Sequence, residues 1–554
     1  MSNRPAETDP HQTPRHTGGS DWWRGAVLYQ IYPRSFQDDN GDGIGDLPGI
    51  TRRLDHVANL GCDGIWLSPI FPSPMADMGY DVSDYVDIDP LFGTLTDFSA
   101  LIDRAHDLGL KVIVDQVMNH SSNLHPWFVE SRSSRDNPRA DWYVWRDPKP
   151  DGSPPNNWPS VFGGPAWTWD GERRQYYLHS FLAEQPDLNY LNPDVQQAVL
   201  DAMRFWLERG VDGFRLDTVN YFFYDPELRD NPAKSFKGEK PPVNHYDWQL
   251  HLYSKSRPEN VEFLRRMRAL TDEYPNRMLL GEVGDADQAI ELMGEYTSGN
   301  DKLHMAYSFD MLSDLYTPDH FREVINGFWA GAPDGWPLWS MSNHDVVRHA
   351  TRWAAKDSGN DALARQAIAL LLAFEGSICL YQGEELGQTD TDLLYSELTD
   401  PVGLRFWPAN KGRDGCRTPM VWVAQDPQGG FTTGTPWLPV KPAQAARAVD
   451  VQVENTASIL THYRRMIAYR RATPALAHGK MRFVDAPDPV LRFTRGAGAD
   501  ALDCVFNLST NPQRVPCPGT AAITGPSQAA ELTGDELTLG PNGWAFLVND
   551  RAGK

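Results

Sequence analysis

The chain has 554 residues, of which 41% are hydrophobic and 23% are charged, and this is the composition of a soluble globular protein with one very large domain or several ordinary ones. An excess of acidic residues gives a net charge of −23, which argues against nucleic acid or an anionic membrane surface as the main partner. No apolar run approaches the ~20 residues that a membrane-spanning helix needs, so the sequence predicts no membrane anchor.

The beginning of the chain and its cysteines bear on the cellular compartment. Residues 1–20 are polar and lack the apolar core of a secretory signal, so we expect a disordered leader. The five cysteines are sparse, and their spacing matches no metal site. These features predict a reduced, cytoplasmic protein, either a monomer or a homodimer, although a processed secretory precursor stays open as an alternative.

From residue 21 onward, short apolar runs alternate with helical patterns. In the stretch 97–110, for example, apolar residues recur at helical spacing, and Asn192 with Pro193 predicts the start of a helix before residue 213. Eight strands alternating with helices favour an α/β fold, the parallel (β/α)8 TIM barrel, over an open doubly wound sheet, because no dinucleotide-binding glycine pattern follows any strand. The predicted strands are 27–36, 64–70, 111–117, 213–219, 278–283, 305–309, 338–341 and 377–382.

The alternation is interrupted after the third predicted strand and again after the eighth. About 65 residues without a barrel pattern follow the third strand, far more than an ordinary loop, and they predict an inserted subdomain at the carboxyl face. Beyond a final helix at 456–471, short alternating strands predict a C-terminal antiparallel β domain. The predicted units are a leader (1–20), a first barrel segment (21–119), the inserted subdomain (120–184), a second barrel segment (185–471, with an irregular excursion at 386–440) and the β domain (472–554).

The run 213–220 ends the fourth predicted strand on a charged pair. Arg215 and Asp217 are two residues apart, so a strand directs both side chains to the same face. A guanidinium group beside a carboxylate favours the ionised form at neutral pH, which a nucleophilic aspartate requires. The alternative is a structural ion pair at the end of a strand.

Two further carboxylates lie at the carboxyl ends of other predicted strands, Glu282 at the end of the fifth and Asp345 just beyond the seventh. Two opposed carboxylates perform glycoside hydrolysis, in which one attacks the anomeric carbon and the other, held protonated, donates to the leaving oxygen. Phosphoryl transfer is disfavoured because no phosphate-binding glycine loop is present, and a serine hydrolase because there is no Gly-x-Ser-x-Gly. A metal hydrolase that uses the same carboxylates and histidines as ligands stays open.

Four short segments then resemble a known family. Residues 115–120, 213–220, Glu282 and 343–345 are similar, in order, to the four sequence blocks of the α-amylase family, glycoside hydrolase family 13. Gln185-Pro186-Asp187-Leu188-Asn189 and the opening segment 22–36 resemble the oligo-1,6-glucosidase and α-glucosidase branch of that family. The resemblance covers nearly the whole chain from residue 21.

The resemblance implies roles that the pattern alone leaves unassigned. It makes Asp217 the nucleophile, Glu282 the general acid/base and Asp345 the third carboxylate. It also implies an Asp77–Arg413 pair that holds a terminal hydroxyl and closes the pocket, so that single terminal glucoses are removed. Further sugar contacts are implied at His120, Arg215 and His344, with Gln185 from the branch motif, while the aromatic residues Tyr80, Phe162, Phe181 and Trp66 are candidates for stacking, against core packing as the ordinary alternative.

Thr218, the residue after Asp217, bears on linkage. Relatives that favour α-1,6 bonds usually carry valine here, and those that favour α-1,4 bonds carry threonine or alanine. We therefore expect a retaining, exo-acting α-glucosidase for short, maltose-like α-glucosides, with transfer of glucose to sugar or alcohol acceptors. The alternatives are an oligo-1,6-glucosidase, a sucrose hydrolase or isomerase, a trehalose-forming mutase, or a non-catalytic transporter heavy chain, which would carry a transmembrane helix and lack the carboxylates.

Oxygen-bearing side chains alternate along residues 38–46. Such spacing, with a glycine for the turn, suits a hard cation, Ca²⁺ or Mg²⁺, although the loop is not an EF-hand. The resemblance implies a structural ion far from the catalytic carboxylates, and no organic cofactor. An acidic turn without metal is the alternative. The predicted ligands are Asp38, Asn40, Asp42 and Asp46, with the backbone carbonyl of Ile44.

Overall fold

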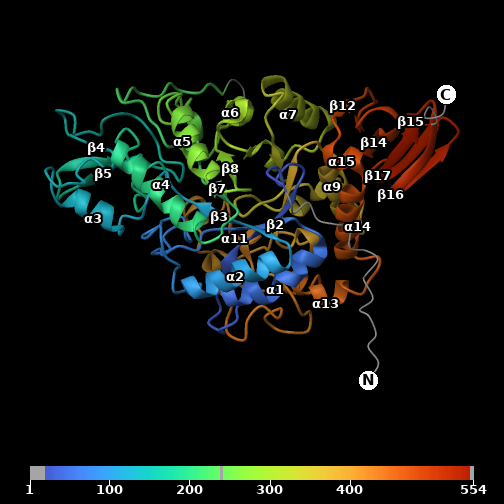
Figure 1. Ribbon diagram of the computed structural model, residues 1–554, viewed down its shortest axis with the longest axis horizontal. Helices are drawn as coiled ribbons and strands as arrows, with labels where there is room; N and C mark the ends of the chain where they lie inside the picture. The colour runs from blue at the N-terminus through green and yellow to red at the C-terminus, as the bar shows by residue number, and fades with distance from the viewer. Residues whose placement is uncertain (1–18, 237–240, 550–554) are drawn as a thin grey trace.

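The computed structural model describes residues 19–236 and 241–549 (Figure 1). Almost all of the predicted leader therefore lies outside the described residues. The barrel occupies the middle of the molecule, a small insert rich in loops lies at one end of the long axis, and an antiparallel sheet lies at the other end (Figure 1). Within the described ranges, no helix is both long enough and apolar enough to cross a membrane.

The predicted (β/α)8 barrel is confirmed. Its eight parallel strands are hydrogen-bonded in the order β10-β11-β1-β2-β3-β7-β8-β9, and a parallel bridge between Ala306 and Pro337 joins the two ends. Most strands end earlier than predicted, because the chain leaves the ladder for the loops that carry the polar residues. The strands are β1 (Val27–Ile31), β2 (Gly64–Leu67), β3 (Lys111–Gln116), β7 (Gly213–Leu216), β8 (Met278–Val283), β9 (Met305–Ser308), β10 (Leu338–Trp339) and β11 (Ser377–Tyr381).

Local signals fix where the helices around the barrel begin. The Asn192 side chain accepts from the Asp194 N–H at the start of α4, and Thr94 forms a capping box with Asp97 at the start of α2. The principal helices are α1 (Leu47–Leu60), α2 (Leu95–Asp107), α4 (Pro193–Leu207), α5 (Asn260–Asp272), α6 (Ala289–Thr297), α7 (Pro318–Gly331), α9 (Ala362–Ala373) and α14 (Ile459–Ala472), and the shorter ones are α3 (Pro126–Ser133), α8 (His349–Arg352), α10 (Pro401–Phe406), α11 (Asp414–Arg417), α12 (Pro442–Ala445), α13 (Val449–Gln452) and α15 (Pro474–His478).

The insert between β3 and β7 has its own small sheet, as does the end of the chain. In the insert, β6 (Gln175–Leu178) lies between β4 (Trp145–Arg146) and β5 (Trp167–Asp170). The exact residue boundaries of the predicted units stay predictions. The C-terminal antiparallel sheet is formed by β12 (Met481–Phe483), β13 (Val490–Arg495), β14 (Leu502–Asn507), β15 (Gln513–Pro516), β16 (Thr520–Thr533) and β17 (Glu536–Asn549).

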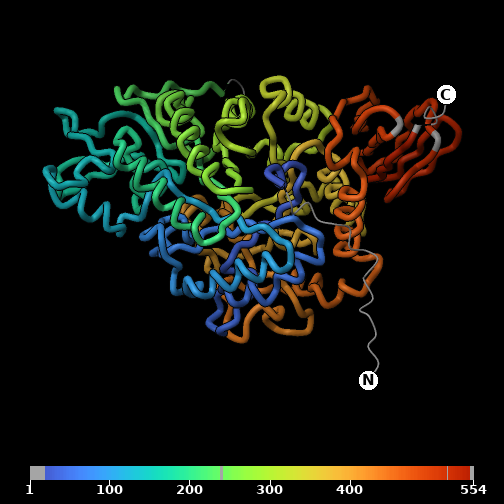
Figure 2. Tube along the Cα trace, in the orientation of Figure 1, coloured from blue at the N-terminus to red at the C-terminus, as the bar shows by residue number. Residues whose placement is uncertain are grey.

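The irregular segment after β11 returns to the first loops of the barrel, beside the N-terminal helices (Figure 2). The Asp38 N–H donates to the Phe431 carbonyl at 3.0 Å, and the Trp437 N–H donates to the Gly43 carbonyl at 3.0 Å. Two segments almost 400 residues apart in sequence are therefore hydrogen-bonded to each other through their backbones. All five cysteines are buried, and none of them forms a disulfide.

Strand periodicity sets the layers inside the barrel. Ile113 and Leu280 belong to the apolar cluster inside the barrel. Asp115 and Glu282 stand two residues further along the same two strands, and therefore share the inward face nearer the carboxyl ends. The interior of the barrel is thus filled by apolar side chains, and a layer of polar side chains lies next to them at the carboxyl ends of the strands.

Candidate active site

Arg215 is fully buried at the centre of this polar layer. Its Nη1 donates to Asp115 Oδ1 at 2.8 Å and to Asp217 Oδ1 at 2.7 Å, while its Nη2 lies 2.5 Å from Glu282 Oε1. The Tyr307 hydroxyl accepts from Arg215 and donates to Glu282 Oε1 at 2.8 Å. Three carboxyl groups therefore share one positive charge, and none of them is fully compensated.

The two predicted catalytic carboxyl groups have unequal proton affinities. Burial raises the pKa of Asp217 to about 6, although the charge of Arg215 acts in the opposite direction. Burial raises the pKa of Glu282 to about 7, again against Arg215, and the charges of Asp217 and Asp345 add to the increase. At neutral pH Asp217 is mostly ionised, as expected from its arginine neighbour, while Glu282 retains its proton for a large share of the time.

Thr218 connects these two carboxyl groups. Its backbone adopts φ +41°, a region that β-branched residues rarely occupy. In this conformation its N–H donates to Glu282 Oε2 at 3.1 Å, and its hydroxyl donates to Asp217 Oδ2 at 3.2 Å. The strained turn after β7 thus fixes the position of the Asp217 and Glu282 carboxyl groups relative to each other.

Arg413 lies at a second charged centre, built from loops. Its Nη2 lies 2.7 Å from Asp77 Oδ1 and 2.6 Å from Asp400 Oδ1, so the predicted Asp77–Arg413 ion pair is formed. The preceding Gly412 has φ +74°, and a Cβ there would lie 2.3 Å from Asp400 Oδ2. Only glycine allows this close approach, and through it the Arg413 N–H donates to Asp400 Oδ2 at 2.7 Å.

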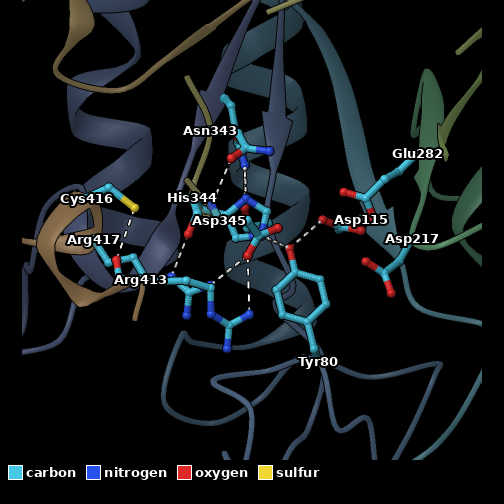
Figure 3. Close-up of polar contacts among 12 residues, drawn as sticks. Tyr80, Asp115, Asp217, Glu282, Asn343, His344, Asp345, Arg413, Cys416 and Arg417 are labelled. Atoms are coloured by element: carbon cyan, nitrogen blue, oxygen red, sulfur yellow. Dashed lines mark hydrogen bonds and ion pairs between the residues drawn. The ribbon is translucent and has the colours of Figure 1, made fainter. Parts of the chain in front are cut away.

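Asp345 joins this second centre. Arg417 Nη2 lies 2.9 Å from Asp345 Oδ1, and Arg413 Nη1 lies 3.3 Å from the same oxygen (Figure 3). Burial alone would raise the pKa of Asp345, but the guanidinium groups of Arg413 and Arg417 outweigh it and hold that pKa below its usual range. Asp345 is therefore ionised wherever the protein is folded near neutral pH.

Tyr80 lies between the two charged centres (Figure 3). Its hydroxyl donates to Asp115 Oδ2 at 3.1 Å, and its ring stacks on that of His344 with centroids 5.4 Å apart. Burial lowers the pKa of His344 well below its usual value, so this ring is neutral. Tyr80 and His344 thus form an uncharged partition between the acidic centre of Arg215 and the ion-pair cluster of Arg413.

His120 and Gln185 occupy the side of the pocket next to Asp77. Gln185 Nε2 lies 3.3 Å from Asp77 Oδ2 and 3.0 Å from His120 Nε2. Burial lowers the pKa of His120 to about 4, so it too is neutral at physiological pH. The branch-specific glutamine is therefore directly connected to the predicted pocket-closing ion pair.

A pocket of about 490 Å³ opens between the two charged centres. Of the predicted catalytic and sugar-contacting residues, Arg215 and His344 lie behind its wall instead of lining it, and both are fully buried. Trp66, a stacking candidate with core packing as the ordinary alternative, lies beneath the Arg215 guanidinium at 4.9 Å and does not line the pocket, so it packs in the core. The predicted residues that line it are Asp77, Tyr80, His120, Phe162, Phe181, Gln185, Asp217, Thr218, Glu282, Asp345 and Arg413.

Four charged or hydrogen-bonding residues of the site have no role predicted from the sequence. Asp115 and Tyr307 share the Arg215 layer, and the strand period could have placed them there, because each is two residues after an inward-facing apolar residue. Asp400 and Arg417 reach the site from the segment after β11. No local signal marks these last two, because only the tertiary path of that segment brings them to the pocket.

The predicted metal ligands lie in a loop closed by its own backbone. Asp38 accepts from the N–H groups of Gly41 and Gly43 at 2.7 and 2.8 Å, and Asp46 caps α1 through the Gly49 N–H. The oxygen donors are of the kind that a hard cation takes. However, no three His, Cys, Asp or Glu side chains converge as metal ligands anywhere in the described part of the chain. The Ca²⁺ or Mg²⁺ ion coordinated by Asp38, Asn40, Asp42, Ile44 and Asp46 stays a prediction.

Comparison with known proteins places this site in a family. The profile of the alpha-amylase catalytic domain matches residues 30–479. The chain is 56% identical to a probable alpha-glucosidase of Rhizobium meliloti (95% of this chain, 97% of the relative) and 37% identical to an oligo-1,6-glucosidase of Heyndrickxia coagulans (89% and 93%).

Solved structures give the same result. The chain is 49% identical to the alpha-glucosyl transfer enzyme XgtA, with a TM-score of 0.92 over 97% of this chain and all of that one. It is 32% identical to an isomaltulose synthase mutant from Erwinia rhapontici NX5 in complex with sucrose, with a TM-score of 0.83 over 95% of this chain and 98% of that one. The chain therefore belongs to the α-amylase family, glycoside hydrolase family 13.

Proposed function

We propose that the protein is a retaining, exo-acting α-glucosidase that removes terminal glucose from short α-glucosides and also transfers it to sugar or alcohol acceptors. The main support is the distribution of charge in one pocket. Asp217 and Glu282, of which Glu282 has the higher pKa, share the Arg215 guanidinium, and the Asp77–Arg413 pair borders the same pocket. Relatives named alpha-glucosidase and a neighbour named as a glucosyl transfer enzyme support the same activity.

The order of the two pKa values supports the following chemical roles. In the first step the Asp217 carboxylate attacks the anomeric carbon while Glu282 donates its proton to the leaving oxygen, which gives a glucosyl-enzyme ester. In the second step Glu282, now a carboxylate, removes the proton of water or of an acceptor hydroxyl that attacks the same carbon from the side of the departed leaving group, and the ester bond to Asp217 breaks to restore its carboxylate. Both steps invert the anomeric centre, so the product keeps the α configuration.

The loop-built centre supports action at chain ends. Arg413, clamped between Asp77 and Asp400, offers N–H donors to a terminal sugar hydroxyl, and the buried Asp77 offers an acceptor. If a glucose is held by this pair, we expect the pair to close the pocket beyond its terminal hydroxyl. The enzyme would therefore release single glucose units instead of cutting within a chain.

Thr218 supports a preference for α-1,4 bonds. Its hydroxyl contacts Asp217 and lines the pocket, so it presents a small polar group where valine would present a methyl group. The alternative, an oligo-1,6-glucosidase or a sucrose-active enzyme, is favoured by the names of several relatives and structural neighbours.

Proton NMR of the sugar first released from maltose tests the proposal, with isomaltose and sucrose measured in parallel. We expect α-glucose as the first product and the highest kcat/KM for maltose. Release of β-glucose would exclude Asp217 as a nucleophile in a retaining mechanism. A higher rate on isomaltose or sucrose would replace the linkage assignment and leave the retaining mechanism intact.

A further inference from the structure

The segment between β7 and α5 packs against the chain just beyond both proposed catalytic acids. It delivers Lys255, whose side chain is only 4% exposed although it bears a charge. The next residue, Ser256, has φ +55°, an uncommon conformation for a residue with a side chain. A buried ammonium group beside a strained residue requires specific partners.

The partners of Lys255 belong to the two segments that follow the catalytic strands. Its Nζ donates to the Gly284 carbonyl at 2.7 Å and to the Tyr221 hydroxyl at 3.3 Å, and it lies 3.8 Å from Asp285 Oδ2. It also lies 5.0 Å from the centre of the Tyr221 ring. Tyr221 and Gly284 both line the catalytic pocket, so the ammonium group lies directly behind its wall.

These partners are close in sequence to the reacting groups. Gly284 is two residues after Glu282 and is the first residue beyond the end of β8, while Tyr221 is four residues after Asp217. The two segments also bond to each other, since the Val219 N–H donates to the Glu282 carbonyl at 3.0 Å and the Gly284 N–H donates to Asn220 Oδ1 at 3.0 Å. Lys255 holds these two segments together on the side away from the pocket, beyond the point where the hydrogen bonds between β7 and β8 end.

A second contact holds Tyr221 from the same direction. The hydroxyl groups of Tyr221 and Tyr246 lie 2.7 Å apart, and the Tyr246 ring stacks on His251 with centroids 3.9 Å apart. Tyr246 and Lys255 both come from the segment between β7 and α5. The wall beside Glu282 is therefore fixed by two independent side chains of one segment.

We infer that Lys255 is a positioning residue for the proton-donating step: it holds the Gly284 carbonyl and Tyr221 so that Glu282 faces the leaving oxygen. The inference rests on the proposed α-glucoside cleavage. Lys255 does not touch the substrate itself, and it acts only through the chain on either side of the wall.

The leaving group separates this role from a general effect on folding. A sugar leaves only if Glu282 protonates it, whereas 4-nitrophenolate leaves without a proton. For Lys255→Met, which keeps the apolar stem, we expect kcat/KM for maltose to fall about 10- to 100-fold. For 4-nitrophenyl α-glucoside we expect a fall below about threefold, because kcat/KM reports only the steps up to departure of the leaving group.

Lys302→Met is the matched control. Lys302 is also buried, and it donates to the Ser298 carbonyl at 2.6 Å and to Asp301 Oδ1 at 2.9 Å, but it does not line or back the pocket. We expect this variant to change kcat/KM equally for the two substrates. If Lys255→Met fails to fold, Tyr246→Phe can replace it in the test, because this change removes only one hydroxyl. We expect Tyr246→Phe to lower the ratio of kcat/KM for maltose to kcat/KM for 4-nitrophenyl α-glucoside about twofold or more.

Equal losses on both substrates for Lys255→Met, or no change in the ratio for Tyr246→Phe, would overturn the positioning role. Failure of the unmodified protein to cleave either substrate would instead overturn the proposed function. The inference would also be contradicted if Lys302→Met lowered the ratio of kcat/KM for maltose to kcat/KM for 4-nitrophenyl α-glucoside as much as Lys255→Met does, because any buried lysine would then have the same effect.

Discussion

Each side of the pocket is organised by an arginine that lowers the pKa of the acids around it, but the net pKa shifts of those acids differ between the two sides. Arg215, fully buried on a barrel strand, is shared by three carboxyl groups, and the pKa values of Asp217 and Glu282 rise to about 6 and about 7. Arg413, on a loop, is joined by Arg417, and the pKa values of Asp345 and Asp400 lie below their usual range despite burial.

The difference lies in the ratio of cations to carboxylates. Where one cation is divided among three acids, burial dominates and protons become available near neutral pH. Where a second arginine is added, Coulomb attraction dominates and the carboxylates remain charged. The strand-built side is therefore suited to moving a proton, and the loop-built side to holding hydroxyl groups. Asp77 is the exception on the loop-built side, because burial raises its pKa to about 6 against the effect of Arg413.

Replacing the proposed nucleophile should produce the largest effect. For Asp217→Asn we expect kcat to fall on the order of 10⁴-fold, because the amide cannot form the glucosyl ester, while the affinity for maltose changes little. Initial rates and calorimetric titration with maltose measure the two quantities. A large loss of affinity with a small loss of kcat would show that Asp217 binds the substrate and does not react with it, which would contradict the proposed difference between the two sides of the pocket.

Removing the loop arginine should have the opposite signature. Arg413→Met leaves Asp77 and Asp400 without their shared cation, which lowers folding stability, and it also removes the N–H donors proposed to hold the terminal hydroxyl of the sugar. We expect KM for maltose to rise about 100-fold or more, with a smaller change in kcat. Lys411→Met, which removes an exposed neighbouring charge paired with Asp392, is the control and should behave like the unmodified protein.

The pH dependence of kcat/KM tests the strand-built side directly. Asp217 must be ionised to attack, so activity should rise as pH increases through about 6, and Glu282 must be protonated to donate, so activity should fall as pH increases through about 7. The result is a narrow bell with its maximum between these values and an approach to tenfold per pH unit on each side. Constant activity up to pH 9 would show that Glu282 is not the proton donor. Because the acids interact, the two midpoints describe the group as a whole.

Thr218→Val should have a moderate effect. It keeps the backbone N–H that contacts Glu282 and removes the hydroxyl that contacts Asp217. We expect the ratio of kcat/KM for maltose to that for isomaltose to fall up to about tenfold, as for other single-group changes in a pocket wall. An unchanged ratio would move linkage preference away from this residue.

The loop at 38–46 belongs to neither side and should show the smallest effect on catalysis. If the predicted ion binds there, removing it with a chelator should lower Tm by about 2 °C or more and leave kcat nearly unchanged. Adding back Ca²⁺ and Mg²⁺ separately then identifies the ion. A Tm that is insensitive to chelation would favour the acidic turn without metal, in which Asp38 and Asp46 accept backbone N–H groups and Asp38 also accepts from the Thr432 hydroxyl.

How much of this arrangement could be read from the sequence depends on how local each signal is. The barrel, and the positions of Asp217 and Glu282 at strand ends, follow from the strand period and from the alternation with helices. Asp77 and Arg413 were predicted only through the family resemblance, since 336 residues separate the two. Asp400 and Arg417 were not assigned, because their approach depends on the path of an irregular segment that no periodicity describes.

The single guanidinium among three buried carboxyl groups has a consequence for inhibitors. When Asp115, Asp217 and Glu282 are ionised, Arg215 leaves an unbalanced negative charge beside the position of the anomeric carbon. A protonated amine of glucose-like shape gains Coulomb attraction there that a neutral sugar lacks. Such a compound would bind more tightly as pH rises through about 6 and about 7, for as long as its own nitrogen stays protonated. Its affinity would therefore increase over the interval above pH 7 in which the turnover of glucosides declines.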